Sequence, residues 1–220
     1  MSAAHATRIL AIRHGETAWN TESRIQGHTD IPLNDTGLWQ AGRVAQALHG
    51  EPLHAVYSSD LLRARATAEA IAQAQQLTLR LETGLRERHF GHLEGLTRDE
   101  IAQRWPEQTR RWLARDPAFG PDGGETLQAF YDRCVGTLAH LARRHPGECI
   151  AVVAHGGVLD CFYRAANRIA LDAPRAWKVG NATINRLLYS AEGFTLVGWA
   201  DDQHLGTSLD ESSDGAVRAA

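Results

Sequence analysis

A short apolar run near the amino terminus reads TRILAIRHG over residues 7–15. The segment from Thr7 to Ile12 has the composition of a buried strand, and the Arg-His-Gly that follows predicts a turn where backbone can approach a ligand. A second run, CIAVVAHGG at residues 149–157, repeats the arrangement, with a strand expected over 149–154. Ligands of open α/β sheets bind beyond the carboxyl ends of the strands, so His14 and His155 are candidates to face one crevice.

The rest of the chain alternates between strand and helix patterns, which indicates an α/β fold. We expect strands over 55–57, 77–81, 184–189 and 194–199, and helices over 35–49, 97–104, 107–114 and 125–144. An alanine-rich helix should reach about residue 74, and another helical segment should follow the second His-Gly. We expect Asp35 to cap the first helix and Ser58-Ser59-Asp60 to cap the alanine-rich one.

Length and composition limit the class of protein. The 220 residues, 43% hydrophobic and 22% charged, predict a single domain over 1–205 and a mobile tail over 206–220. A formal net charge of −3 offers no basic field for nucleic acid. No apolar run approaches the roughly 18 residues that span a membrane, and residues 1–8 lack a signal peptide's apolar stretch. The three cysteines form no C-x-x-C pair, so we expect reduced, buried thiols in a cytoplasmic protein.

His14 has neighbours that are suited to binding an oxyanion. A lone histidine is more often a surface group or a hydrogen-bonded core residue, but Arg13 places a permanent cation beside this imidazole. Gly15 permits close backbone approach, and Thr17 and Asn20 add neutral donors. Together these residues predict an oxyanion site.

The same stretch begins a longer set of motifs. The residues R-H-G-E-T-A-W-N at 13–20 resemble the histidine phosphatase superfamily, also called the phosphoglycerate-mutase-like family. Further matches to that family follow in order at 24–33, 37, 40–41, 58–68, 85–95, 153–157 and 181–182. The resemblance covers most of the chain. It implies a three-layer α/β/α sandwich with a mostly parallel central sheet and a small helical cap over about 97–124.

The resemblance also implies a mechanism in which His14 attacks phosphorus and becomes a phosphohistidine. Arg13, Arg63 and His155 would surround the phosphoryl group, because its transfer gains chiefly from an in-line nucleophile and fixed positive charge. His14 must be neutral to attack, which fits an imidazole whose other nitrogen is held by a backbone carbonyl. Arg63 lies in the first turn of its predicted helix, where the positive helix end favours an anion. We therefore assign Arg63 to the pocket and Arg65 to structure or surface.

Glu87 matches the family's proton donor, which protonates the leaving alkoxide and later deprotonates water. On the residues alone, a salt bridge from Glu87 to Arg86 or Arg88 is the competing interpretation. Glu94 lies beyond Gly91, and we assign it to anchoring the loop.

Secondary positions complete the predicted site. Asn20, Gln26 and the backbone of Gly27 align with family positions that contact phosphate. We assign Gly156 to phosphate binding as well, and the Thr17 hydroxyl as a further hydrogen-bond donor. Three histidines nearby lack carboxylate or cysteine partners at ligand-like spacing: His28, His89 and His92. The family mechanism requires no metal, so we predict neither metal nor cofactor. Three aromatic residues form either an apolar lid or plain packing between short helices: Trp105, Trp112 and Phe119.

Phosphatases and mutases of the family share these catalytic residues, so neighbouring sequence must separate them. Cofactor-dependent phosphoglycerate mutases carry a longer insertion with substrate-binding arginines between the positions of Glu87 and His155, and here that segment is short. Arg110-Arg111 could imitate such a pair, but a solvated helix face is the simpler explanation. The glycolytic mutases of the family have His-Gly-Asn at the positions of residues 155–157, whereas this chain has glycine at 157 and so resembles the phosphatase branches. We therefore predict a phosphatase acting on a small phosphorylated metabolite, with a phosphoglycerate mutase as the alternative.

Other features leave the substrate open. The resemblance extends to broad-specificity acid-type phosphatases and to α-ribazole phosphatases. Asp160 stands where many relatives carry an arginine, which would weaken positive charge near the pocket. A silent module that only binds phosphorylated partners is a third hypothesis, and loss of a catalytic residue would have supported it. The oligomeric state stays open, a homodimer included.

Overall fold

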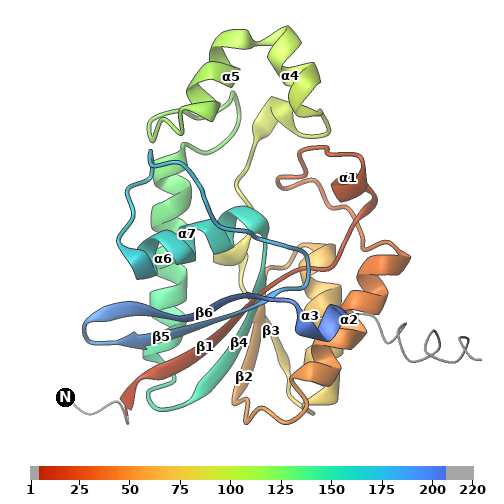
Figure 1. The fold of residues 1–220 in the computed structure, drawn as a ribbon, viewed down its shortest axis with the longest axis vertical. Coiled ribbons are helices and arrows are strands. Elements are labelled where there is room, and N and C mark those ends of the chain that lie inside the picture. The colour runs from red at the N-terminus through yellow and green to blue at the C-terminus, as the bar shows by residue number, and fades with distance from the viewer. Residues whose placement is uncertain (1–4, 207–220) are drawn as a thin grey trace, which may run out of the picture.

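The structure is a computed structural model that describes residues 5–206. The mobile tail predicted over 206–220 falls, except for Gly206, outside the described residues. One six-stranded sheet has the order β3-β2-β4-β1-β5-β6 (Figure 1). Its strands are β1 (Thr7–Arg13), β2 (Ala55–Ser58), β3 (Leu79–Leu81), β4 (Cys149–Ala154), β5 (Ile184–Ser190) and β6 (Gly193–Asp201). The first four run parallel and the last two join antiparallel, so the predicted mostly parallel sheet is confirmed.

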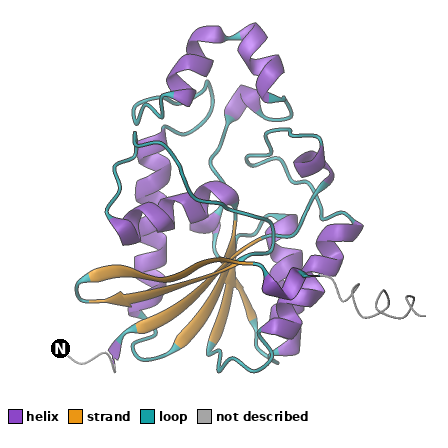
Figure 2. Cartoon of the chain, viewed as in Figure 1, coloured by secondary structure: helices purple, strands orange, loops and turns teal. Residues whose placement is uncertain are grey.

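Helices cover both faces of the sheet (Figure 2). On one face lie α2 (Asp35–Ala47) and α3 (Leu62–Ala74), and on the other α6 (Leu127–Arg143) and α7 (Gly156–Asn167). In β1, Ile9 and Ala11 join the core of α6 and α7, whereas Leu10 and Ile12 join the core of α2 and α3. Because successive strand side chains point to opposite faces, an unbroken apolar run serves both cores. The three-layer sandwich is confirmed.

The predicted cap of α2 is displaced by one residue. Asn34 is the capping residue, and its side-chain oxygen accepts the backbone N–H of Gly37 at 2.8 Å. Asp35, predicted as the cap, is the first helical residue and places a negative charge in the first turn. One short helix, α1 (Ala18–Thr21), had no sequence prediction.

The predicted cap of α3 is wrong, because a distant residue takes its place. The helix follows Leu61, which makes no side-chain capping bond. Asp60 binds Arg86 through both carboxylate oxygens. The backbone N–H of Leu62 instead donates to the Asp30 carboxylate at 2.7 Å. A tertiary contact thus supplies the acceptor that was expected from local sequence.

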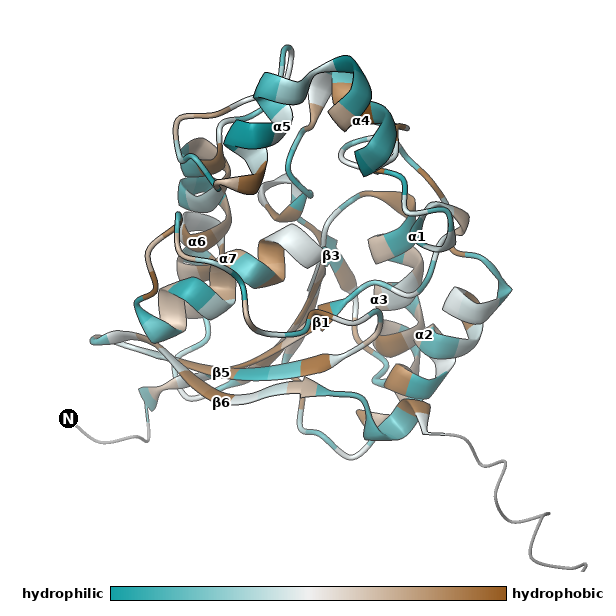
Figure 3. Ribbon diagram, turned by 45° about the horizontal axis from the view of Figure 1, so that its top comes forward, coloured by the Kyte–Doolittle hydropathy of each residue, from teal (hydrophilic) through white to brown (hydrophobic). Residues whose placement is uncertain are grey.

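A small helical cap lies above the carboxyl end of the sheet. It contains α4 (Arg98–Arg104) and α5 (Pro106–Leu113), each within one residue of its predicted bounds. Thr97 and Glu100 form a capping box at the start of α4. Figure 3 shows that these two helices are mostly hydrophilic, as expected for a layer in contact with solvent. Three 3₁₀ turns complete the described range: η2 (Thr83–Leu85), η3 (Gly91–Leu93) and η4 (Gln203–Leu205).

A buried ion pair ties the segment after α5 to α7. Arg115 donates to Asp160 Oδ2 at 2.8 Å, and the fully buried Arg164 donates to the same oxygen at 3.0 Å. Arg115 also donates to the carbonyl of Leu171 at 2.7 Å. Two arginines therefore balance the Asp160 carboxylate.

Replacing Asp160 with alanine is expected to lower the free energy of unfolding by about 3–5 kcal/mol, because Arg164 then carries a buried charge without its partner. The two side chains are only 7% and 0% exposed, so water cannot replace the lost contact. Urea denaturation measures the change. Asp132→Ala on the exposed face of α6 is the matched control and should change stability by less than about 0.5 kcal/mol. Equal stability of the two variants would contradict the assigned ion pair.

Candidate active site

Strand register brings His14 and His155 together. β1 and β4 pair in parallel with Arg13 opposite Ala154, so the next residue of each strand is a histidine. The backbone N–H of His14 donates to the carbonyl of Ala154 at 3.0 Å, and the centroids of the two imidazoles are 5.2 Å apart. The two His-Gly turns therefore do form one crevice.

A backbone contact fixes the tautomer of His14. Its Nδ1 lies 2.7 Å from the carbonyl oxygen of Gly15 and donates to it, because a carbonyl only accepts. Nε2 then carries the lone pair. Burial and the positive charges of Arg63 and Arg13 lower the pKa of His14 well below 6.5, against an opposing effect of the Gly15 carbonyl. His14 is neutral near pH 7, with a nucleophilic nitrogen available.

Arg63 is fixed in the first turn of α3 and is 1% exposed. Its guanidinium donates to the carbonyl oxygens of Gly27 at 2.8 Å and Thr29 at 3.0 Å. Arg65 faces solvent and pairs with Glu69 at 2.7 Å. The structure thus places Arg63 at the pocket and Arg65 on the surface.

Several buried polar atoms near the two histidines have no protein partner within residues 5–206. They are Arg13 Nε, Arg63 Nε, Gln26 Oε1 and both ring nitrogens of His155. Buried polar atoms are normally hydrogen-bonded, so this cluster is suited to binding a ligand. The guanidinium of Arg13 is oriented by a hydrogen bond that its Nη1 donates to the carbonyl oxygen of Val179 at 2.6 Å. Burial lowers the pKa of Arg13 and of Arg63 to about 10, so both stay charged near neutral pH.

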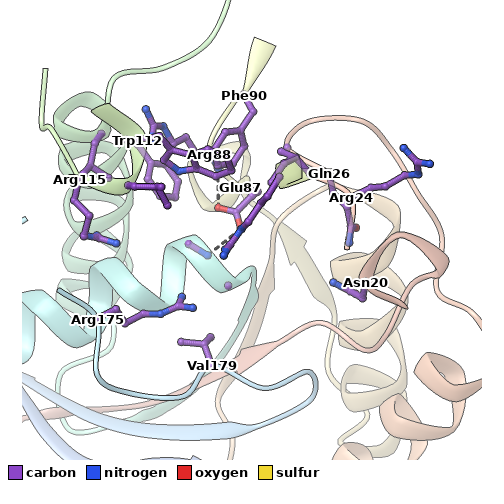
Figure 4. Close-up of a pocket in the computed structure, with 18 of the residues that line it drawn as sticks. Asn20, Arg24, Gln26, Glu87, Arg88, Phe90, Trp112, Arg115, Arg175 and Val179 are labelled. Atoms are coloured by element: carbon purple, nitrogen blue, oxygen red, sulfur yellow. Dashed lines mark hydrogen bonds between the residues drawn. The ribbon is translucent and has the colours of Figure 1, made fainter. Parts of the chain in front are cut away.

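Glu87 approaches the site from the loop before the cap. Its Oε2 accepts the backbone N–H of Gly157 at 2.9 Å, and its Oε1 accepts that of Arg88 at 2.8 Å (Figure 4). Arg86 pairs with Asp60, and the side chain of Arg88 donates to backbone carbonyls. Neither arginine forms a side-chain salt bridge with Glu87, so the competing interpretation of this residue is wrong.

These groups, except the fully buried His155, line a cavity of about 800 Å³ between the sheet and the cap. Four of the residues predicted to contact phosphate line it: Asn20, Gln26, Gly27 and Gly156. Thr17 does not line it, because the Thr17 hydroxyl donates to Asn20 Oδ1 at 3.1 Å within the capping box of α1. The predicted contact from Thr17 to phosphate is therefore not supported, and this side chain orients Asn20.

The cap contributes one aromatic wall. Trp112 lines the cavity beside Phe90, and the centroids of their rings are 5.7 Å apart. Trp105 packs edge-on against His92, and Phe119 is buried, so neither belongs to the lining found within the described residues. The lid interpretation applies to Trp112, and plain packing applies to the other two.

Glu94 anchors the loop that carries Gly27, as predicted. Its carboxylate accepts the backbone N–H groups of His28, Thr29 and Phe90 at 2.9–3.0 Å. Gly27 has a φ of +53°, and a Cβ there would lie 2.1 Å from Glu94 Oε1. Only glycine fits this position while Glu94 holds the loop.

Residues 5–206 contain no group of three or more His, Cys, Asp or Glu side chains arranged to hold a metal ion. The rings of His28 and His89 stack, with centroids 4.6 Å apart. Within the same range, no helix has the length and apolar character needed to cross a membrane. All three cysteines are buried and free.

Comparison with known proteins decides the family. Residues 9–202 match the model of the histidine phosphatase superfamily (branch 1). The chain belongs to this superfamily. It is 41% identical over 201 residues to phosphoglycerate mutase-like protein 4 of Arabidopsis thaliana, covering 90% of this chain and 86% of that protein. It is 38% identical over 205 residues to a metal-independent phosphoserine phosphatase of the same plant, covering 91% and 84%.

A solved relative supports the same fold. Bacillus stearothermophilus YhfR superposes with a TM-score of 0.85 at 31% sequence identity, over 90% of this chain and 99% of that one. The phosphoglycerate-mutase-like fold implied by the motifs is confirmed.

Sequence reasoning missed several residues that line the cavity of this histidine phosphatase. The largest omissions are Arg115 and Arg175, which lie in irregular segments after α5 and after α7. Neither belongs to a motif or a periodic pattern, so no sequence signal distinguishes them from other arginines. The Asp160 interpretation also changes, because its carboxylate is held by Arg115 and Arg164.

Gly157 leaves room for Glu87 in this histidine phosphatase. A Cβ at position 157 would lie 2.3 Å from Glu87 Oε1 and 3.2 Å from Phe130. Gly157→Ala should therefore displace the carboxylate while the protein stays folded, and should reduce kcat on the order of 10²-fold. Gly136→Ala on α6, where a Cβ meets nothing within 4 Å, is the matched control. Unchanged kinetics in Gly157→Ala, measured by phosphate release, would show that Glu87 tolerates displacement.

Proposed function

We propose that this protein is a metal-independent phosphatase that hydrolyses small phosphate monoesters through a phosphohistidine on His14. The observation that carries the proposal is the free Nε2 of a neutral, buried His14 beside the unpartnered guanidinium nitrogens of Arg13 and Arg63. Such an arrangement supplies a positioned nucleophile and fixed positive charge for the transferring oxygens. His155 adds ring nitrogens on the adjacent strand end.

The first step transfers the phosphoryl group to the protein. His14 Nε2 forms a bond to phosphorus while the ester P–O bond breaks. The leaving oxygen takes the proton of the Glu87 carboxyl group, and the alcohol departs. Arg13, Arg63 and one ring N–H of the neutral His155 donate hydrogen bonds to the oxygens of the transferring group, and the two guanidinium groups balance its charge.

The second step returns the site to its starting state. Glu87, now a carboxylate, removes a proton from a water molecule that attacks the phosphohistidine. The N–P bond breaks, inorganic phosphate leaves, and His14 is neutral again. Glu87 keeps its place through the two backbone N–H groups of Arg88 and Gly157.

The structure favours hydrolysis over the mutase alternative. Arg110 pairs with Glu107 and Arg111 with Asp116, and neither arginine lines the cavity among the described residues. They do not form the second anion site that a mutase of this family would need. The relative named a metal-independent phosphoserine phosphatase adds support. The three free, buried thiols support a cytoplasmic location as part of this proposal.

Assay of the wild-type protein with EDTA against a panel of phosphate monoesters tests the proposal. The panel includes 3-phosphoglycerate with and without 2,3-bisphosphoglycerate, and both released phosphate and isomerised product are measured. Phosphate release without isomerisation is expected. Isomerisation without release would establish the mutase, and binding with neither reaction would favour the silent module.

A further inference from the structure

The cavity is rich in arginine, and most of these arginines are already engaged. Seven line it: Arg13, Arg24, Arg63, Arg88, Arg98, Arg115 and Arg175. Arg13 and Arg63 face the phosphoryl site. Three others are engaged by carboxylates or backbone carbonyls: Arg24, Arg88 and Arg115. Arg98 and Arg175 have no hydrogen-bond or ion-pair partner within residues 5–206, so they are available to a ligand.

These two arginines differ in position. Arg98 lies on α4 in the cap, with its guanidinium 5.8 Å from the centroid of the Trp112 ring. Arg175 lies in the loop between α7 and β5 and points toward the cavity (Figure 4). Four residues later in the same loop, Val179 accepts the hydrogen bond of Arg13. Four residues span at most about 14 Å, so Arg175 belongs to the neighbourhood of the phosphoryl site.

Electrostatics supports the same placement. Burial lowers the pKa of Arg13, the negative charge of Glu87 opposes this, and the positive charge of Arg175 lowers it further. Arg175 is therefore close enough to Arg13 for their charges to interact. An anionic group between Arg175 and the phosphoryl site would relieve this repulsion.

The loop that carries Arg175 is held on both sides. Before it, Arg164 donates to the carbonyl oxygen of Ala173 at 2.9 Å. After it, Trp177 stacks on Tyr163 with ring centroids 4.1 Å apart. The Nε1–H of Trp199 donates to the carbonyl oxygen of Lys178 at 2.7 Å. A side chain on a held loop is suited to selecting a ligand.

We propose that Arg175 is a specificity-determining residue that binds a carboxylate on the leaving group of the substrate. The inference rests on the proposed phosphatase function and names its substrate class: phosphate monoesters with a carboxylate a few atoms from the phosphate. The fork of one guanidinium matches the two oxygens of one carboxylate. A second phosphate would be better served by several cations, but the other free arginine, Arg98, lies on the cap.

Two substrates that differ only in a carboxylate test the proposal. The experiment compares kcat/KM for O-phosphoserine and O-phosphoethanolamine in the wild type, Arg175→Ala, Arg175→Lys and Arg98→Ala. The wild type should prefer O-phosphoserine. Arg175→Ala should lower this preference by about 10–100-fold, mainly through KM, because a charge-assisted hydrogen-bond pair is lost. Arg175→Lys should restore part of it, and Arg98→Ala should change it less than about 3-fold.

The ratio is measured within one protein, so partial unfolding of a variant cancels. An unchanged ratio in Arg175→Ala, or an equal loss in Arg98→Ala, would overturn the assignment. Selective loss of fructose 1,6-bisphosphate turnover in Arg175→Ala would show that the bound group is a second phosphate. Failure of the phosphatase function itself is distinct, because the wild type would then release phosphate from neither substrate.

Discussion

Replacing His14 with alanine is expected to reduce phosphate release by on the order of 10⁴-fold or more, because no other group can accept the phosphoryl group in line. In the proposed mechanism the Nε2 lone pair of His14 is the nucleophile, and the adjacent His155 ring is turned 59° from the His14 ring. The variant should also lose the acid-labile phosphoprotein that forms when the wild type is quenched during turnover.

The matched control for this variant is His140→Ala, on the exposed side of α6. It should keep wild-type turnover and phosphoprotein. If His14→Ala released phosphate at a rate near that of the control, His14 would not be the nucleophile. A phosphoprotein that persisted in the variant would place the covalent group on another residue.

The environment of His14 also sets a pH dependence. Since burial and two arginines lower its pKa below 6.5, the neutral nucleophile persists as pH falls through that value. The His155 pKa is lowered as well, first by burial and then by Arg63. Between the lowered values and 6.5 the unfolded chain binds more protons than the folded one, so folding stability falls as pH drops below about 6.5.

Replacing Glu87 with glutamine is expected to reduce turnover of alkyl phosphates by roughly 10²–10⁴-fold, because an amide cannot protonate the leaving oxygen. The amide has nearly the same shape as the carboxyl group, so the fold should be kept. For p-nitrophenyl phosphate, kcat/KM should fall much less, since this constant reports the first step, in which its leaving group departs readily without a proton. Steady-state kinetics with both substrates measures the difference.

Glu69→Gln, on the exposed side of α3, is the control for this substitution. An equal loss of kcat/KM on both substrates in Glu87→Gln would mean that Glu87 does not act as the proton donor. The comparison therefore separates proton transfer from a general effect on the pocket.

Local sequence was enough to predict most elements of the fold. The strand over 149–154 was predicted with the observed bounds, because its apolar residues are buried on both faces and the two glycines after His155 mark its end. The helix caps were harder. The N–H of Leu62 is satisfied by Asp30, which precedes it by 32 residues, and no local pattern can show such a partner.

The features of the candidate site also fall into two groups, those that sequence motifs identify and those that depend on tertiary geometry. The residues His14, Arg63, Glu87 and His155 could be found from sequence because each belongs to a motif. The orientation of Thr17 toward Asn20, which removes it from the cavity, could not be found, since it depends on the geometry of a single short helix.

The sequence by itself determined the two strand-and-turn units and the chemical identity of the groups at their ends. Only the tertiary structure decided which groups meet, because the paired residues of β1 and β4 are 141 positions apart in the chain and their parallel register alone places the two histidines side by side. It also decided which arginines are available to a substrate. Arg115 and Arg175 have the same side chain, but Arg115 is paired with Asp160 whereas Arg175 has no ion-pair partner within the described residues.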